Sequence, residues 1–216
     1  MYIVIDGMDG CGKGTLIKSL EKEFPNFFFV REPGGTEVGE RIRKIILEDP
    51  LDFMTELHLF FAQRHHLLNT VVVPYTSRGE VVISDRGLSS TFAFQLCGRM
   101  HLQELEKYFW DTVSHLPKKA DVYIFLDLPA EVASERTRAR SADFCQQMSH
   151  FDAEQLEFHQ RVRNGFLQFG QREAGSKVFV VNAENSPGQV LQEVRDILRV
   201  LFSEKKLSLT CSRFKG

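Results

Sequence analysis

Residues Gly7 to Thr15 combine four closely spaced glycines with one lysine. Glycine lets the main chain turn its amide groups inward and come close to an anion, because no Cβ stands in the way. Lys13 adds a point charge, and the stretch after it has a helical pattern, so unpaired amides at a helix N-terminus would face the same anion. The segment predicts a cradle for the polyphosphate of a nucleotide, formed by Gly7, Met8, Asp9, Gly10, Cys11, Gly12, Lys13, Gly14 and Thr15.

The spacing of Gly7, Gly12 and Lys13 fits the phosphate-loop pattern G-x-x-x-x-G-K. Gly14 stands where a Ser or Thr usually places a hydroxyl on Mg²⁺, and Thr15 supplies the hydroxyl one position later. A simple glycine turn with an incidental lysine is the weaker interpretation, because an apolar run precedes the loop and an amphipathic stretch follows it. We expect the Lys13 ammonium to face solvent and the nucleotide to bind with Mg²⁺.

Asp85 and Arg86 follow an apolar run that begins at Val81. In open α/β sheets ligands bind at the carboxyl ends of parallel strands, so these two side chains are candidates for a ligand site.

Three arginines, Arg136, Arg138 and Arg140, lie two residues apart in a polar stretch that ends near His150. Such a run is usually a solvated helix face. Residues two apart spread around a helix, however, and a chain with a phosphate loop has a polyphosphate to enclose. We therefore predict a lid over residues 136–150.

Five short apolar runs predict strands at Tyr2–Ile5, Phe27–Val30, Val81–Asp85, Asp121–Asp127 and Lys177–Val181. Amphipathic stretches predict helices at Leu16–Phe24, Val38–Leu47, Thr55–Val73, Phe92–Gly98, His101–His115, Asp152–Gln171 and Pro187–Phe202, with another starting at Pro129 and with Pro74 ending the third. Strands that alternate with helices predict an α/β fold in which a five-stranded parallel sheet carries helices on both faces.

The 216 residues, 43% of them hydrophobic, can bury a substantial core, and we expect one domain over residues 1–202 with a C-terminal tail at 203–216. Lys plus Arg number 27 and Asp plus Glu 29, so the net charge of −2 gives no reason to expect a nucleic-acid polymer as partner. Four scattered cysteines without metal spacing indicate reduced thiols. No apolar stretch approaches the roughly 18 residues of a membrane span, so we expect a cytoplasmic protein without a membrane partner.

The motifs together resemble the thymidylate kinase family, over about residues 2 to 202. The resemblance rests on the phosphate loop, on Arg-Glu-Pro-Gly-Gly-Thr at 31–36, on Phe60 to Arg64, on Asp85-Arg86 with the Ser and Ala-Phe-Gln that follow, on Asp-Leu-Pro at 127–129 and on the arginine run. It implies a sheet of phosphate-loop kinase type, a homodimer, and transfer of the γ-phosphate of ATP to dTMP, giving dTDP and ADP for dTTP synthesis.

The resemblance also implies roles for single residues. Lys13, Arg86, Arg136, Arg138 and Arg140 would be catalytic, and Asp85 and Thr15 would hold Mg²⁺ through water. Phe60 would stack on the thymine, Arg64 would donate to a base carbonyl, and Phe94 would crowd the 2′ carbon of the ribose. The set implied for dTMP is Asp9, Pro33, Phe60, Arg64, Arg86, Ser90, Thr91, Phe94 and Gln95.

Three positions depart from the family pattern. Gly14 gives Gly-Lys-Gly-Thr, a form similar to the adenylate and uridylate kinases; Gly87 stands where Tyr or His usually follows Asp-Arg; and Asn182-Ala183 replaces a frequent Asp-Ala. Another nucleoside monophosphate kinase, of the UMP/CMP type, is therefore the nearest alternative. A nucleotide-binding switch protein is the alternative from another class, but a switch needs neither a second nucleotide site nor an arginine-rich lid.

Overall fold

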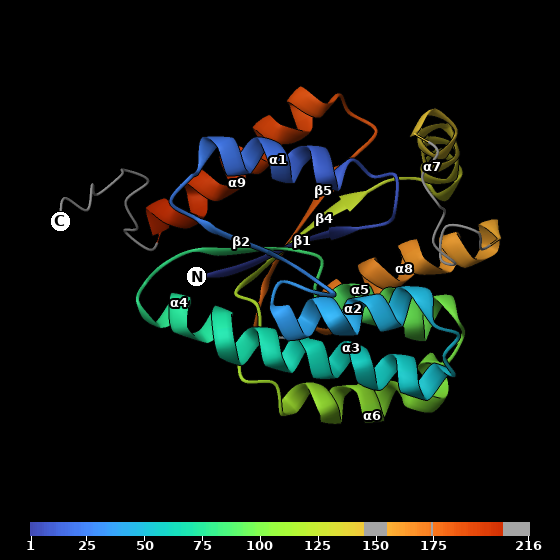
Figure 1. Ribbon diagram of the computed structural model, residues 1–216. Helices are drawn as coiled ribbons and strands as arrows, with labels where there is room; N and C mark the ends of the chain where they lie inside the picture. The colour runs from blue at the N-terminus through green and yellow to red at the C-terminus, as the bar shows by residue number, and fades with distance from the viewer. Residues whose placement is uncertain (145–154, 174, 205–216) are drawn as a thin grey trace.

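A computed structural model describes residues 1–144, 155–173 and 175–204 of the chain. Its strands form one parallel sheet in the order β2-β3-β1-β4-β5, as Figure 1 shows. The strands are β1 (Tyr2–Gly7), β2 (Phe28–Arg31), β3 (Val82–Asp85), β4 (Val122–Asp127) and β5 (Lys177–Asn182). All five predicted strands are confirmed to within two residues at each end.

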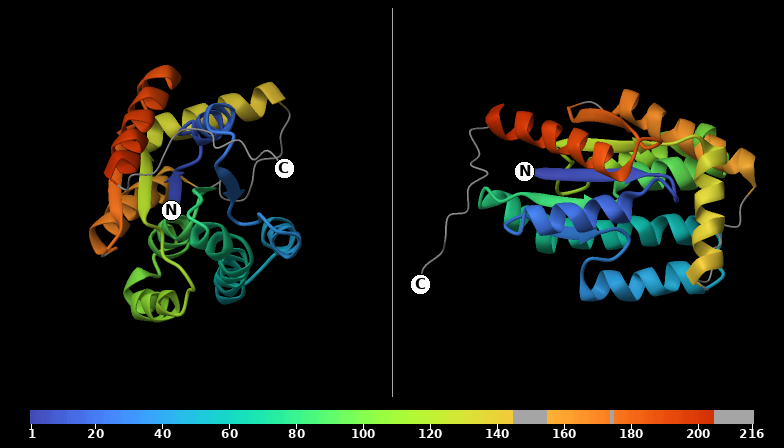
Figure 2. Two further views of the ribbon diagram at one scale, coloured as in Figure 1. Left: turned by 90° about the vertical axis from the view of Figure 1, so that its left-hand side faces the viewer. Right: turned by 90° about the horizontal axis from the view of Figure 1, so that it is seen from above.

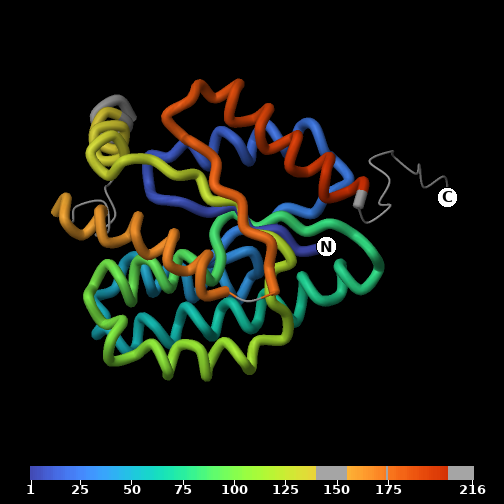
Figure 3. Tube along the Cα trace, turned by 180° about the vertical axis from the view of Figure 1, so that it is seen from behind, coloured from blue at the N-terminus to red at the C-terminus, as the bar shows by residue number. Residues whose placement is uncertain are grey.

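Helices cover both faces of this sheet. They are α1 (Lys13–Glu23), α2 (Glu37–Glu48), α3 (Phe53–Leu67), α4 (Val73–Ser77), α5 (Leu88–Thr91), α6 (Leu102–Ser114), α7 (Ala130–Phe144), α8 (Leu156–Arg172) and α9 (Pro187–Glu204). Helices α1 and α9 lie together on one face, and α3, α6 and α8 lie on the other, in Figure 1 and in the opposite view of Figure 3. The predicted α/β fold of phosphate-loop kinase type is confirmed.

Strand β1 lies at the centre of the sheet between β3 and β4. Ile3, Val4 and Ile5 are at most 1% exposed, as expected for a parallel strand covered on both faces. The register pairs Ile5 with Asp85, and Gly7 with Leu126. The loops after β1, β3 and β4 therefore leave the sheet at one edge, and α7 crosses this end of the molecule in Figure 2.

An aromatic cluster fills the core between the sheet and the helices α6 and α8. The Phe92 ring lies 5.5 Å from the Phe109 ring and 5.6 Å from the Phe169 ring, centroid to centroid. Phe92 opens a π-helical segment, η2 (Phe92–Gly98), that continues α5. The cluster therefore anchors the segment in which the sequence places Phe94 and Gln95.

The predicted single helix from Thr55 to Val73, ended by Pro74, was wrong in its bounds. Helix α3 begins at Phe53 because the Asp52 carboxylate accepts a hydrogen bond from the Thr55 amide at 3.0 Å. It passes through a π-helical segment, η1 (Leu68–Val72), into α4, whose first turn contains Pro74. Proline is accommodated there at the change from π to α winding, where the helical hydrogen-bond pattern shifts.

Other helix boundaries also differ from the prediction. Helix α1 starts at Lys13 rather than Leu16, and α9 runs to Glu204, two residues beyond the predicted end of the domain. Residues 145–150 of the predicted lid, Asp152 at the predicted start of α8 and residues 205–216 of the tail lie outside the described residues. In the ranges that the structure describes, no helix is both long and apolar enough to cross a membrane.

Candidate active site

The loop after β1 forms the predicted cradle, which is a hollow of about 230 Å³ lined from Met8 to Thr15 and by Lys18. Gly7 and Gly10 have φ values of 148° and 80°, which L side chains rarely adopt. A Cβ on Gly7 would lie 2.6 Å from the Leu126 carbonyl oxygen, and one on Gly10 would lie 2.4 Å from that of Ala133. Only glycine fits at either position, so the sequence fixes the shape of the cradle.

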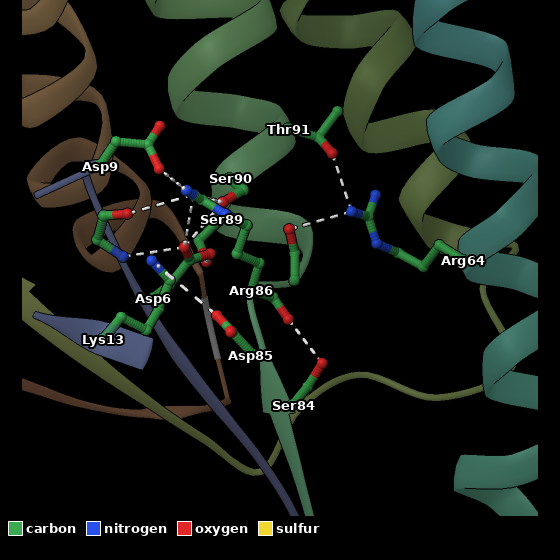
Figure 4. Close-up of polar contacts among 12 residues, drawn as sticks. Asp6, Asp9, Lys13, Arg64, Ser84, Asp85, Arg86, Ser89, Ser90 and Thr91 are labelled. Atoms are coloured by element: carbon green, nitrogen blue, oxygen red, sulfur yellow. Dashed lines mark hydrogen bonds and ion pairs between the residues drawn. The ribbon is translucent and has the colours of Figure 1, made fainter. Parts of the chain in front are cut away.

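Lys13 stands in this cradle, but its side chain is not solvent-facing as predicted. The residue is 7% exposed, and its ammonium lies 4.0 Å from Oδ1 of Asp85 at the end of β3. The contact forms because β1 and β3 end side by side, which brings the start of α1 over the end of β3. Figure 4 shows the two side chains facing each other.

Gly14 has no comparable constraint. It has no positive φ, and a Cβ there would meet no atom within 4 Å. Thr15 follows it at the exposed start of α1 and lines the cradle. The backbone therefore does not require glycine at position 14. The lack of a Ser or Thr hydroxyl at this position cannot be explained by backbone conformation.

Arg86 joins the cradle to the end of β3 and adopts a positive φ of 69°. Its guanidinium forms an ion pair with the Asp9 carboxylate and donates to the Ser90 hydroxyl at 3.1 Å and to the Gly7 carbonyl at 3.3 Å. Burial lowers the pKa of this guanidinium, but the carboxylates of Asp9, Asp6 and Asp85 outweigh it and raise the pKa above its ordinary value. Arg86 is therefore a fixed positive charge at the floor of the site.

Asp6 holds this arrangement together and was missed in the sequence. It is fully buried, and its carboxylate accepts from the Gly7 amide at 2.9 Å, the Ser90 hydroxyl at 2.7 Å and the Ser89 hydroxyl at 2.6 Å. The same carboxylate lies 3.7 Å from Arg86. An acidic residue inside an otherwise apolar strand was the signal that could have found it, because a buried charge requires partners.

A cavity of about 240 Å³ opens beside Arg86. All the residues that the resemblance implied for dTMP line it: Asp9, Pro33, Phe60, Arg64, Arg86, Ser90, Thr91, Phe94 and Gln95. Glu32, Arg43, Leu47 and Gly87 line it as well. Asp9 lines both this cavity and the cradle, so the two hollows are adjacent.

Arg64 is 2% exposed in the wall of the cavity. Its Nε lies 2.7 Å from Oε2 of Glu32, and its Nη2 donates to the Gly87 carbonyl at 3.0 Å and to the Thr91 hydroxyl at 2.9 Å. Within the described part of the chain, the buried Nη1 has no hydrogen-bond partner. One donor of a fixed arginine is thus left for a ligand.

Glu32 and Arg43 were also missed as cavity residues. Glu32 lies in the Arg-Glu-Pro-Gly-Gly-Thr motif, which was the signal for it, whereas Arg43 lies among the polar positions of an amphipathic helix, which gave none. Arg43 donates to the Pro33 carbonyl at 2.8 Å. Burial, together with the charges of Arg31 and Arg86, lowers the pKa of Arg43.

Gly87 forms the cavity wall next to β1 in an extended conformation, with φ at −171°. A Cβ at this position would lie 2.9 Å and 3.0 Å from the two methyl groups of Val4. Val4 is 1% exposed in the middle of the sheet. Glycine is therefore required at position 87 by close packing against Val4 rather than by the backbone angle.

The three lid arginines differ in their placement. Arg136 on α7 donates to the Ala183 carbonyl at 2.9 Å and lines a third hollow, of about 110 Å³, between the loop, α1 and the start of α9. Arg138 is exposed on α7. Arg140 lies in the same helix, but its side chain is outside the described part of the structure. Arg136 therefore lines neither the cradle nor the acceptor cavity, but a hollow that shares Cys11, Gly12 and Thr15 with the cradle.

Comparison with known proteins agrees with this geometry. A family model described as thymidylate kinase matches residues 5–194. The thymidylate kinase of Acinetobacter baylyi is 33% identical over 210 residues, which cover 93% of this chain and 100% of the relative. Those of Maridesulfovibrio salexigens and Carboxydothermus hydrogenoformans are each 34% identical, over 90% and 93% of this chain and over 93% and 97% of their own lengths. The chain therefore belongs to the thymidylate kinase family, the ATP-dependent nucleoside monophosphate kinases that phosphorylate dTMP.

Proposed function

We propose that in this chain the γ-phosphoryl group of ATP passes to dTMP at the point where the cradle and the acceptor cavity meet. The observation that carries the proposal is that Asp9 lines both hollows. ATP would place its phosphates in the cradle, and dTMP would place its phosphate beside Arg86. A switch protein has no use for the second cavity, and this favours the kinase over that alternative.

Phosphoryl transfer needs in-line positioning and positive charge more than covalent help, because its transition state is loose. Lys13 and the amides of the cradle supply charge at the donor phosphates, and Arg86 supplies it at the acceptor phosphate. Arg86 is held by Asp9, Ser90 and the Gly7 carbonyl, so it needs little reorganisation when charge develops. Arg138 and Arg140 would add charge when the lid closes.

The residues at the cradle suit Mg²⁺. Oδ1 of Asp85 is buried and makes no hydrogen bond to any described residue, and carboxylate oxygen is the ligand that Mg²⁺ prefers. The described residues contain no group of three or more acidic, His or Cys side chains that could hold a metal. This matches an ion held by one or two protein groups and the nucleotide phosphates, here Asp85 and Thr15 through water. When bound, the ion neutralises charge on the donor phosphates.

The cavity wall fits a deoxythymidine. Phe60 and Arg64 lie one helical turn apart on α3, are 8% and 2% exposed, and both line the cavity. Phe60 would stack on the base, and the unpartnered Nη1 of Arg64 would donate to a base carbonyl. Phe94 lies under Arg86, with its ring centroid 5.3 Å from the guanidinium carbon, where it would crowd the ribose.

Dimerisation and compartment form the rest of the proposal. The family resemblance supports a homodimer, and the net charge of −2 supports a protein without a nucleic-acid polymer as partner. No membrane partner is proposed either. The proposed compartment is the cytoplasm. Light scattering coupled to size-exclusion chromatography measures the mass and so tests the dimer.

An acceptor panel of dTMP, dUMP, UMP, CMP and AMP tests the function. We expect dTMP to give the highest kcat/KM. The ratio of kcat/KM for dTMP to that for dUMP should correspond to about 1–3 kcal/mol of transition-state free energy, the usual value of one missing carbon in an apolar pocket. Equal turnover of UMP and dTMP would reassign the chain to the pyrimidine ribonucleotide kinases. ATP consumption that ignored every monophosphate would favour the switch.

Arg136 would act on the adenine end of ATP rather than on the transferred group. It donates to the Ala183 carbonyl in the third hollow, and Asn182-Ala183 stands where the family often has Asp-Ala near the adenine. We expect Arg136→Ala to raise the KM for ATP by about tenfold, the effect of about 1.4 kcal/mol of lost binding, with little change in kcat. Arg138→Ala on the same helix is the matched variant and should lower kcat instead. Steady-state kinetics with ATP varied at saturating dTMP separates them, and a fall in kcat alone for Arg136→Ala would contradict its assignment to the adenine.

A further inference from the structure

Glu56 is a buried carboxylate to which the proposed reaction gives no role. It lies on α3 and is 3% exposed. Its Oε1 accepts a hydrogen bond from Nε2 of Gln95 at 3.2 Å, and its Oε2 lies 3.3 Å from Nη2 of Arg99. Gln95 is the member of this group that lines the acceptor cavity.

The carboxylate fixes which way the Gln95 amide faces. A side-chain amide has a donor end and an acceptor end, and either can point to a given neighbour. A carboxylate paired with a guanidinium only accepts, so the NH₂ end of Gln95 must face Glu56. Its Oε1 is then turned away from Glu56, and no described residue donates a hydrogen bond to it.

The cavity is consequently lined by one residue with a free acceptor, Gln95, and by one with a free donor, Arg64. The donor is the buried Nη1 of Arg64, which has no partner within the described residues. A pyrimidine with a carbonyl at C4 and a hydrogen on N3 presents the complementary pair. A pyrimidine with an amino group at C4 presents a donor and a bare nitrogen at those positions, so it is mismatched to both groups.

We propose that Glu56 is a positioning residue that locks the Gln95 amide and thereby selects 4-oxo pyrimidine nucleotides against 4-amino pyrimidine nucleotides. The proposal rests on the proposed function, in which the acceptor base lies against Arg64 and Gln95. Glu56 acts through Gln95 and does not touch the base. Arg99 forms an ion pair with the same carboxylate at 3.3 Å.

The variant Glu56→Gln tests the lock, because two amides can hydrogen-bond in either orientation and Gln95 is then free to reverse. The measurement is kcat/KM for dTMP and for 5-methyl-dCMP, which carry the same ring and methyl group and differ at C4 and N3. We expect the preference for dTMP to fall by about tenfold or more, as when a polar group is left unmatched in a closed pocket. Loss of a merely structural residue would lower both values together.

Glu173→Gln is the matched control. Glu173 is also buried, at 5% exposed, and paired with a cation, Lys119 at 3.4 Å, but it does not line the acceptor cavity. Removing its charge should leave the ratio of the two substrates unchanged.

The double variant Glu56→Gln with Gln95→Glu exchanges the two groups. The amide at position 56 would donate to the carboxylate at position 95, whose second oxygen returns an acceptor to the cavity. We expect the preference for dTMP to be restored to within about threefold of wild type, because complementarity rather than residue identity sets specificity.

The results of these experiments distinguish a failure of the positioning role of Glu56 from a failure of the proposed kinase function. A cooperatively melting Glu56→Gln enzyme with an unchanged substrate ratio overturns the positioning role, and so does a folded double variant that fails to prefer dTMP. If Glu56→Gln does not fold, the double variant decides alone. Wild type that phosphorylates neither nucleotide would instead mean that the proposed function fails.

Discussion

Replacement of Lys13 by alanine should lower kcat by about 100-fold to 1,000-fold, the range found when one preorganised donor is removed from a transition-state site. Lys13 is 7% exposed and lines the cradle with its ammonium 4.0 Å from Asp85, so it stands where the donor phosphates would lie. The loss should fall on kcat more than on the KM for ATP, because charge on the transferred group is largest in the transition state. Steady-state kinetics with saturating dTMP measures it.

The fold of the Lys13→Ala protein should survive. The contact with Asp85 is long, at 4.0 Å, and the Asp85 side chain is 31% exposed, so its loss should change the free energy of unfolding by no more than about 1 kcal/mol. Lys22→Ala, an exposed lysine in the last turn of α1, is the control and should leave both kinetics and melting unaltered. If Lys13→Ala kept more than about a tenth of wild-type activity, which is a barrier change under about 1.4 kcal/mol, the assignment of Lys13 would be wrong.

Replacement of Asp6 by alanine should be the most destabilising single change in the site. It removes the acceptor for the Gly7 amide and for the hydroxyls of Ser89 and Ser90. It also takes a carboxylate from beside the partly buried Arg86. Breaking a buried charged network in this way costs about 3–5 kcal/mol, so chemical denaturation should show a much lower midpoint with an unchanged slope.

Asp6→Asn separates charge from hydrogen bonding. The amide keeps one accepting oxygen for Gly7 and Ser90, and the Ser89 hydroxyl can rotate to accept from the new NH₂ group. We therefore expect a smaller loss of stability than for alanine but a clear fall in kcat/KM, because Arg86 loses one of its anchoring charges. Equal stability of the two variants would show that the hydrogen bonds kept by asparagine contribute nothing, and that the negative charge alone stabilises the loop.

The fold was largely predictable because its signals are local. The apolar runs of β1, β3 and β4 are buried on both faces, and continuous apolar runs of this length predict parallel strands. The path after α3 was not predictable, since a change from α to π winding at Leu68 has no signature in hydrophobic periodicity. Pro74 was consequently taken as a helix end, whereas it begins a new helical segment.

The site was predictable where family motifs carry it and not where tertiary partners do. Phe60 and Gln95 were found through their motifs, and both line the cavity. Asp6, Arg43 and Glu56 lie in segments whose pattern is that of an ordinary strand or helix. Their importance depends on which residues meet them across the fold, and one sequence does not contain that information.

The contact between Gly87 and Val4 limits the order in which this site can change during evolution. A larger residue at position 87 would collide with the Val4 methyl groups, so it would arise with a penalty unless position 4 first became alanine. The bond from Arg64 to residue 87 uses the main-chain carbonyl, which every amino acid possesses. Descendants of this sequence could thus rebuild one wall of the cavity without losing the arginine anchor, provided that the substitution at position 4 came first.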